Sequence, residues 1–128
     1  MHHTIFLCFA LLIPLIFLGG CAPSASDAYH KITPQAGYEM MKKEEITLID
    51  VREPAEYQQG HIPGARLIPL GTIDDSVTAK LPDKKKPLIV YCRSGVRSKK
   101  AAMKLVELGY SDVRDMGGIL DWPYEIEK

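Results

Sequence analysis

The sequence predicts an α/β domain with a parallel β-sheet and helices on both of its faces. Short apolar segments of strand type occupy residues 46–50, 67–68 and 88–91, and segments of helical composition separate them. Strands that are apolar along their whole length are typical of parallel sheets, because helices cover both faces of such a sheet. The alternation of strand and helix supports the same class, since parallel strands need a crossover connection between them.

The predicted helices are defined by the residues that start and stop them. Thr33 followed by Pro34 has the pattern of an N-cap and a proline at the first helical position. A short helix is expected over residues 54–59, and the strongest helix over residues 98–108, which Gly109 ends. The inward face of this last helix is expected to consist of Ala102, Leu105, Val106 and Leu108.

Two weaker elements complete the predicted domain. Residues 74–80 form a loose segment with helical character, and residues 113–115 form a last short strand. We expect one folded domain over residues 33–128, preceded by a tether over residues 21–32 that is rich in small side chains.

The first twenty residues have the features of a lipoprotein signal peptide. Residues 5–18 form a run of fourteen apolar residues, which is short for a membrane-spanning helix and suits the apolar region of a signal peptide. The segment Leu18-Gly19-Gly20-Cys21 resembles a bacterial lipobox, which implies that Cys21 is acylated and becomes the first residue of the mature protein. We therefore expect an exported lipoprotein that is anchored in a membrane and faces the periplasm or the cell exterior.

One feature of this signal departs from the usual pattern. The segment Met1-His2-His3-Thr4 contains no lysine or arginine, whereas signal peptides usually carry positive charge before the apolar run. An uncleaved membrane anchor is the alternative interpretation. In both cases the domain is tethered outside the cytoplasm.

The charge balance and the cysteines narrow the class of protein further. The chain has 16 basic and 16 acidic residues, so no overall positive charge indicates a nucleic-acid partner. Of the three cysteines, Cys8 lies in the signal peptide and Cys21 would carry lipid. Cys92 is then the only free thiol of the mature domain, and no internal disulfide is possible.

Cys92 has the surroundings expected of a nucleophile. The apolar strand over residues 88–91 leads directly into it, and a helix is predicted shortly after it. The backbone N–H groups at a helix N-terminus favour a thiolate and can hold a bound anion, and nearby arginines act in the same direction. The alternative is a buried and inert core cysteine. The residues that follow Cys92 disfavour that alternative, because they form a polar and cationic loop of Arg93, Ser94, Gly95, Val96 and Arg97.

Three motifs in a fixed order resemble the single-domain rhodanese-like sulfurtransferases. The first is IDVREPAEYQQGHIPGA at residues 49–65, the second is the Cys92 loop, and the third is MGGILDW at residues 116–122. The resemblance covers about Thr33 to Trp122, and three ordered motifs are far more specific than one short pattern. The resemblance implies a rhodanese-like fold, with a small parallel sheet of about five strands flanked by helices. It also implies transfer of a sulfane sulfur through a persulfide of Cys92.

The residues of the Cys92 loop suit this chemistry on electrostatic grounds. A donor such as thiosulfate is an anion that must approach a thiolate, so the site must offset two negative charges. Backbone N–H groups curled around Cys92 can do this, and Gly95 permits the inward turn. Arg93 and Arg97 are expected to screen the charge and to contact the anion.

The expected partners follow from the same chemistry. The donor is a small anion such as thiosulfate, a polysulfide or a persulfide, and the acceptor is cyanide, a thiol or a thioredoxin-like protein. No cofactor is expected. A metal is not expected either, because His61 lies inside a motif without a second ligand at useful spacing. We expect the domain to be a monomer that contacts the membrane through its lipid and binds no nucleic acid.

Asp50 and Arg52 are supporting candidates with two open interpretations. Both follow a strand that is expected to neighbour the Cys92 strand. In the functional interpretation, Asp50 orients the Cys92 loop through a charged hydrogen bond. In the structural interpretation, the two residues form a helix cap and a surface ion pair near Pro54.

Two other functions remain as alternatives. The first is a non-autonomous sulfur carrier or binding module that serves an exported sulfur pathway. The second is a phosphatase or arsenate reductase of a similar fold. Those enzymes place five residues between the cysteine and the arginine, so that a tetrahedral phosphate fits, whereas only four residues separate Cys92 from Arg97.

Overall fold

The computed structural model describes residues 25–128. The predicted signal peptide over residues 1–20 and the predicted lipidation site Cys21 lie outside the described residues. No helix within residues 25–128 combines the length and the apolar character that crossing a membrane requires.

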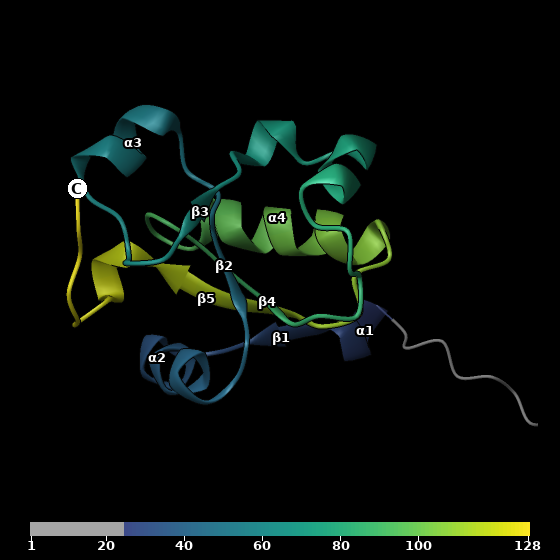
Figure 1. Cartoon of the computed structure of the whole chain (residues 1–128), viewed down its shortest axis with the longest axis horizontal. Helices are drawn as coiled ribbons and strands as arrows, with labels where there is room; N and C mark the ends of the chain where they lie inside the picture. The colour runs from purple at the N-terminus through teal and green to yellow at the C-terminus, as the bar shows by residue number, and fades with distance from the viewer. Residues whose placement is uncertain (1–24) are drawn as a thin grey trace, which may run out of the picture.

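A five-stranded sheet forms the centre of the domain, and every strand pair in it is parallel (Figure 1). The order across the sheet is β1-β5-β4-β2-β3, so β4 lies in the middle and all five of its residues are buried. This confirms the predicted parallel α/β class. The strands are β1 Tyr29–Lys31, β2 Thr47–Asp50, β3 Arg66–Leu67, β4 Leu88–Cys92 and β5 Val113–Gly118.

Helices connect the strands and cover both faces of the sheet, as predicted (Figure 1). Thr33 caps the helix after β1, because its side-chain oxygen accepts a hydrogen bond from the backbone N–H of Ala36 at 3.0 Å. The α-helices are α1 Ala25–Ala28, α2 Pro34–Lys43, α3 Pro54–Gln59 and α4 Val96–Glu107. The 3-10 helices are η1 Leu70–Thr72, η2 Asp75–Ala79 and η3 Ile119–Asp121.

Side chains of β4 alternate between two apolar cores, one on each face of the sheet. Leu88, Val90 and Cys92 belong to the core that includes the inner face of α4. Ile89 and Tyr91 belong to the opposite core, which α2 covers. Full burial of one such side chain contributes about 1.5–3 kcal/mol to the stability of the fold. Because β4 supplies buried side chains to both cores, it stabilises the layers on both faces of the sheet. The alternation also places the Cys92 side chain on the same face as α4.

The N-terminal boundary of the domain differs from the prediction. The tether predicted over residues 21–32 contains α1 and β1, and β1 pairs with β5 through Tyr29↔Val113, His30↔Arg114 and Lys31↔Asp115. A boundary at residue 33 is therefore too late. The small-residue composition of the segment suggested a linker, but an edge strand is held by backbone hydrogen bonds and needs few apolar side chains.

Two further elements are longer than predicted, and both adjoin Cys92. Helix α4 begins at Val96 instead of residue 98, and β5 continues through Gly118 instead of ending at residue 115. Gly95 is the N-cap of α4 and has no side chain to announce the start. A pair of glycines at the end of β5 carries equally little strand signal, because glycine is depleted in strands.

Candidate active site

Cys92 is the last residue of β4 and lies beneath a loop that turns back over it. Its backbone is opposite Gly118 of β5, across an irregularity in the pairing of the two strands. The loop lasts only three residues before α4 begins at Val96. The backbone N–H of Gly95 donates a hydrogen bond to the Cys92 sulfur, with an N–S distance of 3.0 Å. This contact is the inward-turned N–H that the sequence predicted.

The loop turns back at Gly95 and passes close to the two glycines at the end of β5. Gly95 has a φ of +107°, a left-handed conformation that favours glycine. A Cβ atom on Gly118 would lie 2.7 Å from the Cα of Ser94, so only glycine permits this approach. A Cβ atom on Gly95 would lie 3.6 Å from the Cα of Gly117. The glycine pair of the third motif is therefore the surface on which the Cys92 loop rests.

The surroundings of the sulfur favour negative charge. The first N–H groups of a helix have no partner within the helix, and α4 directs this end toward the Cys92 loop. A charge or anion at this place is stabilised by the dipole of the twelve-residue helix. Arg93 and Ser94 are exposed, so the loop presents a cation and a hydroxyl to solvent.

Cys92 is nevertheless fully buried, with 0 % of its surface exposed, and it is a free thiol. The inert-core interpretation therefore described its burial correctly. It did not describe its environment, because the sulfur accepts the Gly95 N–H within a loop whose outer side chains are polar. Burial beside a directed N–H group distinguishes this thiol from a cysteine that merely fills a core.

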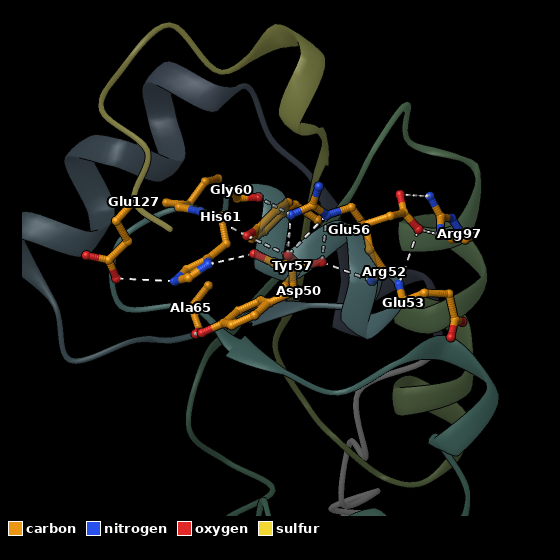
Figure 2. Close-up of polar contacts among 12 residues, drawn as sticks. Asp50, Arg52, Glu53, Glu56, Tyr57, Gly60, His61, Ala65, Arg97 and Glu127 are labelled. Atoms are coloured by element: carbon orange, nitrogen blue, oxygen red, sulfur yellow. Dashed lines mark hydrogen bonds and ion pairs between the residues drawn. The ribbon is translucent and has the colours of Figure 1, made fainter.

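Arg97 is held by Glu56 and is not a free anion-binding side chain. Its Nη1 and Nη2 atoms lie 2.6 and 2.9 Å from the two carboxylate oxygens of Glu56 (Figure 2). The hydrogen bonds from Arg97 lower the pKa of Glu56 to about 2, while partial burial opposes this shift. Glu56 in turn raises the pKa of Arg97. The pair ties the first turn of α4 to α3.

Asp50 and Arg52 form an ion pair, as the structural interpretation expected, but the pair is buried and does not cap a helix. The Arg52 guanidinium contacts both carboxylate oxygens of Asp50 at 2.7–3.1 Å (Figure 2). It also donates to the Gly60 carbonyl oxygen at 2.7 Å. Asp50 is 0 % exposed, so the pair is not on the surface, and its partners are not in the Cys92 loop.

The cap of α3 comes from other residues. Glu53 and Glu56 form a capping box at its N-terminus, so Asp50 does not serve as the cap. The Tyr91 hydroxyl, whose pKa is raised mainly by burial, donates to Asp50 at 2.9 Å and accepts the N–H of Ile62 at 3.1 Å. The ion pair therefore connects β2, β4 and the turn after α3.

His61 holds that turn in place through its ring and its backbone. Its Nδ1 lies 2.9 Å from the Tyr57 carbonyl oxygen, and its ring stacks on that of Tyr57 (Figure 2). Its Nε2 lies 3.3 Å from a carboxylate oxygen of Glu127. Backbone hydrogen bonds of 2.8 and 2.9 Å between His61 and Glu127 attach the C-terminal segment to the turn.

Two buried polar residues near the loop were not predicted as site residues. Ser98 lies in the first turn of α4, and Asp115 lies in β5 behind the loop. Their side chains are joined by a hydrogen bond of 2.7 Å. The signal in the sequence was weak, although an aspartate inside the last predicted strand is itself unusual, because aspartate is depleted in strands.

The site thus consists of a buried cysteine at the carboxyl end of a central parallel strand, under a loop that leads into a helix. A model of the rhodanese-like domain family matches residues 33–124. The chain therefore belongs to the rhodanese-like family. It is a rhodanese-type enzyme.

Relatives with assigned names agree with this family. Thiosulfate sulfurtransferase PspE of Escherichia coli strain K12 is 42% identical over 73 residues, which cover 57% of this chain and 70% of that protein. Thiosulfate sulfurtransferase GlpE of Pseudoalteromonas translucida is 36% identical over 96 residues, which cover 74% of this chain and 90% of that protein. These relatives support sulfurtransferase activity of the rhodanese type.

Solved structures share the fold. A structure described as rhodanese with anions from E. coli has a TM-score of 0.62 and is 38% identical in sequence. The match covers 66% of this chain and 99% of the E. coli chain. A rhodanese-like domain protein from Staphylococcus aureus has a TM-score of 0.67 and is 31% identical in sequence. The match covers 77% of this chain and 96% of the S. aureus chain.

Replacing Glu56 by glutamine should lower stability in a pH-dependent way. The pKa of Glu56 falls on folding from 4.5 to about 2, so its contribution is fully present above about pH 4.5 and is lost as the pH falls toward 2. Allowing for solvent screening of this partly exposed pair, we expect Glu56→Gln to cost about 1 kcal/mol at pH 7 and almost nothing near pH 2. Chemical denaturation at several pH values measures the difference.

The matched control is Glu39→Gln, which removes an exposed carboxylate lying 3.7 Å from Lys42 on the surface of α2. We expect less than about 0.5 kcal/mol at any pH for this variant. Equal losses for both variants at pH 7 would contradict the role given to the Glu56–Arg97 pair.

Proposed function

We propose that Cys92 is the nucleophile of a sulfurtransferase and carries the transferred sulfur as a persulfide. The observation that carries this proposal is the N–H of Gly95, which lies 3.0 Å from the Cys92 sulfur at the start of α4. A donor aimed at a sulfur stabilises a negative charge there, and both the thiolate and the persulfide anion carry that charge. The names of the two relatives above support thiosulfate as a donor.

The reaction consists of two displacements at sulfur. The Cys92 thiolate attacks the outer sulfur of thiosulfate, the bond between the two thiosulfate sulfurs breaks, and sulfite leaves with the electron pair. The product is a Cys92 persulfide anion. An acceptor nucleophile such as cyanide or a thiolate then attacks the terminal sulfur and regenerates the Cys92 thiolate, so the cycle needs no external oxidant or reductant.

Access to the sulfur requires movement of the atoms around it. Cys92 is 0 % exposed, so solvent does not reach its side chain in this conformation. Thiosulfate is larger than water and must displace part of the cover before attack. The exposed residues Arg93 and Ser94 occupy the outer part of the loop, where such a displacement disturbs the fewest buried contacts. Arg93 is the cation that remains available to a donor, since Arg97 is paired with Glu56.

The size of the loop argues for sulfur and against phosphate. Only four residues separate Cys92 from Arg97, and Gly95 already contacts the sulfur. A tetrahedral phosphate would need a wider ring of N–H groups than this loop provides. We therefore place sulfur transfer ahead of a phosphatase or arsenate reductase activity.

We further propose that the domain works outside the cytoplasm on a lipid anchor at Cys21. The apolar run over residues 5–18 and the lipobox-like segment that ends at Cys21 support this location. The protein then faces the periplasm or the cell exterior. Its acceptor in that place is a small thiol or a thioredoxin-like protein.

Cys92→Ser should reduce the transfer of sulfur from thiosulfate to cyanide by about a thousandfold or more, because a hydroxyl is a far poorer nucleophile at neutral pH. The substitution keeps nearly the same shape, so the thermal unfolding temperature should change little. Steady-state formation of thiocyanate measures the rate. A variant that retains activity close to that of the wild type would rule out Cys92 as the sulfur carrier.

Inserting one glycine between Gly95 and Val96 should lower kcat/KM for thiosulfate by about tenfold or more. The insertion leaves Arg93 and Arg97 in place, so its effect reports the shape of the N–H ring and not its net charge. The control is a glycine inserted between Lys85 and Lys86, both of which are exposed. A wild-type protein that hydrolyses an aryl phosphate faster than it transfers sulfur would contradict the assignment.

Cys21→Ala should prevent lipid attachment and move the protein from the membrane fraction to the soluble fraction. Stable anchoring requires more than one acyl chain, and the alanine of the variant has no thiol to which lipid can be attached. Fractionation of cells and the intact mass of the isolated protein measure the change. A variant that stays in the membrane and retains residues 1–20 would instead support the uncleaved anchor.

A further inference from the structure

The carboxylate of Asp115 lies behind the Cys92 loop and has no part in the reaction described above. It is 1 % exposed, and four groups of the protein surround it. Its Oδ1 atom accepts from the Ser98 hydroxyl at 2.7 Å and from the Gly117 N–H at 2.9 Å, and it lies 3.8 Å from the Lys31 ammonium. Its Oδ2 atom accepts from the Tyr29 hydroxyl at 2.8 Å. Desolvation and this contact raise the pKa of Tyr29 to about 12.

The contacts of Oδ1 lead to the loop from two sides. Ser98 belongs to the first turn of α4, and its hydroxyl also lies 3.0 Å from the carbonyl oxygen of Gly95. Gly117 belongs to β5, on which the loop lies, and its Cα would be 3.6 Å from a Cβ atom on Gly95. One buried oxygen therefore holds both the helix that follows Gly95 and the strand beneath it.

Gly95 needs such a constraint more than any other residue of the loop. It is the residue whose N–H points at the Cys92 sulfur, and its φ of +107° is accessible because it has no side chain. The freedom that permits this conformation also permits many others. Two neighbours restrict that freedom: the Ser98 hydroxyl, which contacts the Gly95 carbonyl oxygen, and Gly117, which lies against Gly95.

We propose that Asp115, acting through Ser98 and Gly117, positions Gly95 so that its N–H is directed at the Cys92 sulfur. The inference rests on the proposed function where it concerns turnover. Asp115 and Ser98 are positioning residues in this account, because neither contacts the sulfur. A charge-assisted hydrogen bond suits this purpose, since it is shorter and stronger than a neutral one.

The network also joins the edge strand β1 to the loop. Tyr29 and Lys31 of β1 both contact Asp115, and these residues precede the segment that the family model matches. Two residues of the predicted tether, Tyr29 and Lys31, therefore belong to the network that holds the Cys92 loop.

The test compares Ser98→Ala with Ser111→Ala. Both substitutions remove one hydroxyl near a backbone carbonyl oxygen. Ser111 lies in the turn after α4, and its Oγ atom is 3.2 Å from the carbonyl oxygen of Lys84. The first readout is the amide resonance of Gly95 in the resting protein, measured by NMR. Cys92→Ala supplies the reference position for a Gly95 N–H that has no sulfur acceptor. The second readout is kcat and KM for thiosulfate with cyanide as acceptor.

We expect Ser98→Ala to move the Gly95 resonance at least halfway toward its position in Cys92→Ala. We also expect kcat to fall about tenfold with KM changed less than about twofold, because the misdirected N–H serves the transition state more than substrate binding. Ser111→Ala should change neither readout. Asp115→Asn, which keeps the volume and loses the charge, provides a second variant with the same expectation if Ser98→Ala does not fold.

The proposal requires both changes in Ser98→Ala. An unmoved Gly95 resonance, an unchanged kcat, or equal effects in Ser111→Ala would each overturn it. A loss of thermal stability alone would show that the network is merely structural. If the wild-type protein transfers no sulfur, the proposed function fails, whereas the Gly95 resonance of the resting protein still tests whether Ser98 directs that N–H.

Discussion

The hydrogen bond from the Gly95 N–H to the Cys92 sulfur sets the requirements that the surrounding structure meets. The chain must reverse within three residues of leaving β4, and it must do so against the end of β5. This is possible because Gly118 has no side chain at that end, since a Cβ atom on it would lie 2.7 Å from the Cα of Ser94. The helix that begins immediately afterwards adds the field of its N-terminus to the same place. Strand, loop and helix thus act on one sulfur atom.

Two sets of charged contacts hold this loop and the neighbouring turn in place. The Glu56–Arg97 pair ties the first turn of α4 to α3, and the Asp115 network ties it to β5 and β1. The buried Asp50–Arg52 pair fixes the turn after α3 and not the loop itself. Charges that the sequence placed near the chemistry therefore serve mainly as supports, and Arg93 is left as the exposed cation of the loop.

The fold class and the position of Cys92 between a strand and a helix followed from the sequence, because both depend on local patterns. An apolar strand that ends on a cysteine and a helix soon after it are visible in order along the chain. The partners of Arg97 and Asp50 were not predictable in this way, since each is fixed by contacts between segments far apart in sequence, such as Glu56 with Arg97 and Tyr91 with Asp50. Strand β1 was missed because backbone pairing leaves little trace in a three-residue segment.

The central claim is that a sulfur atom resides on Cys92 during the reaction. Intact mass spectrometry of the purified domain, before and after thiosulfate and again after cyanide, tests it most directly. The account predicts that the mass rises by one sulfur atom with thiosulfate and returns to its initial value with cyanide, and that Cys92→Ser shows neither change. An adduct that forms equally on Cys92→Ser, or thiocyanate production by a protein that never gains the sulfur, would contradict it.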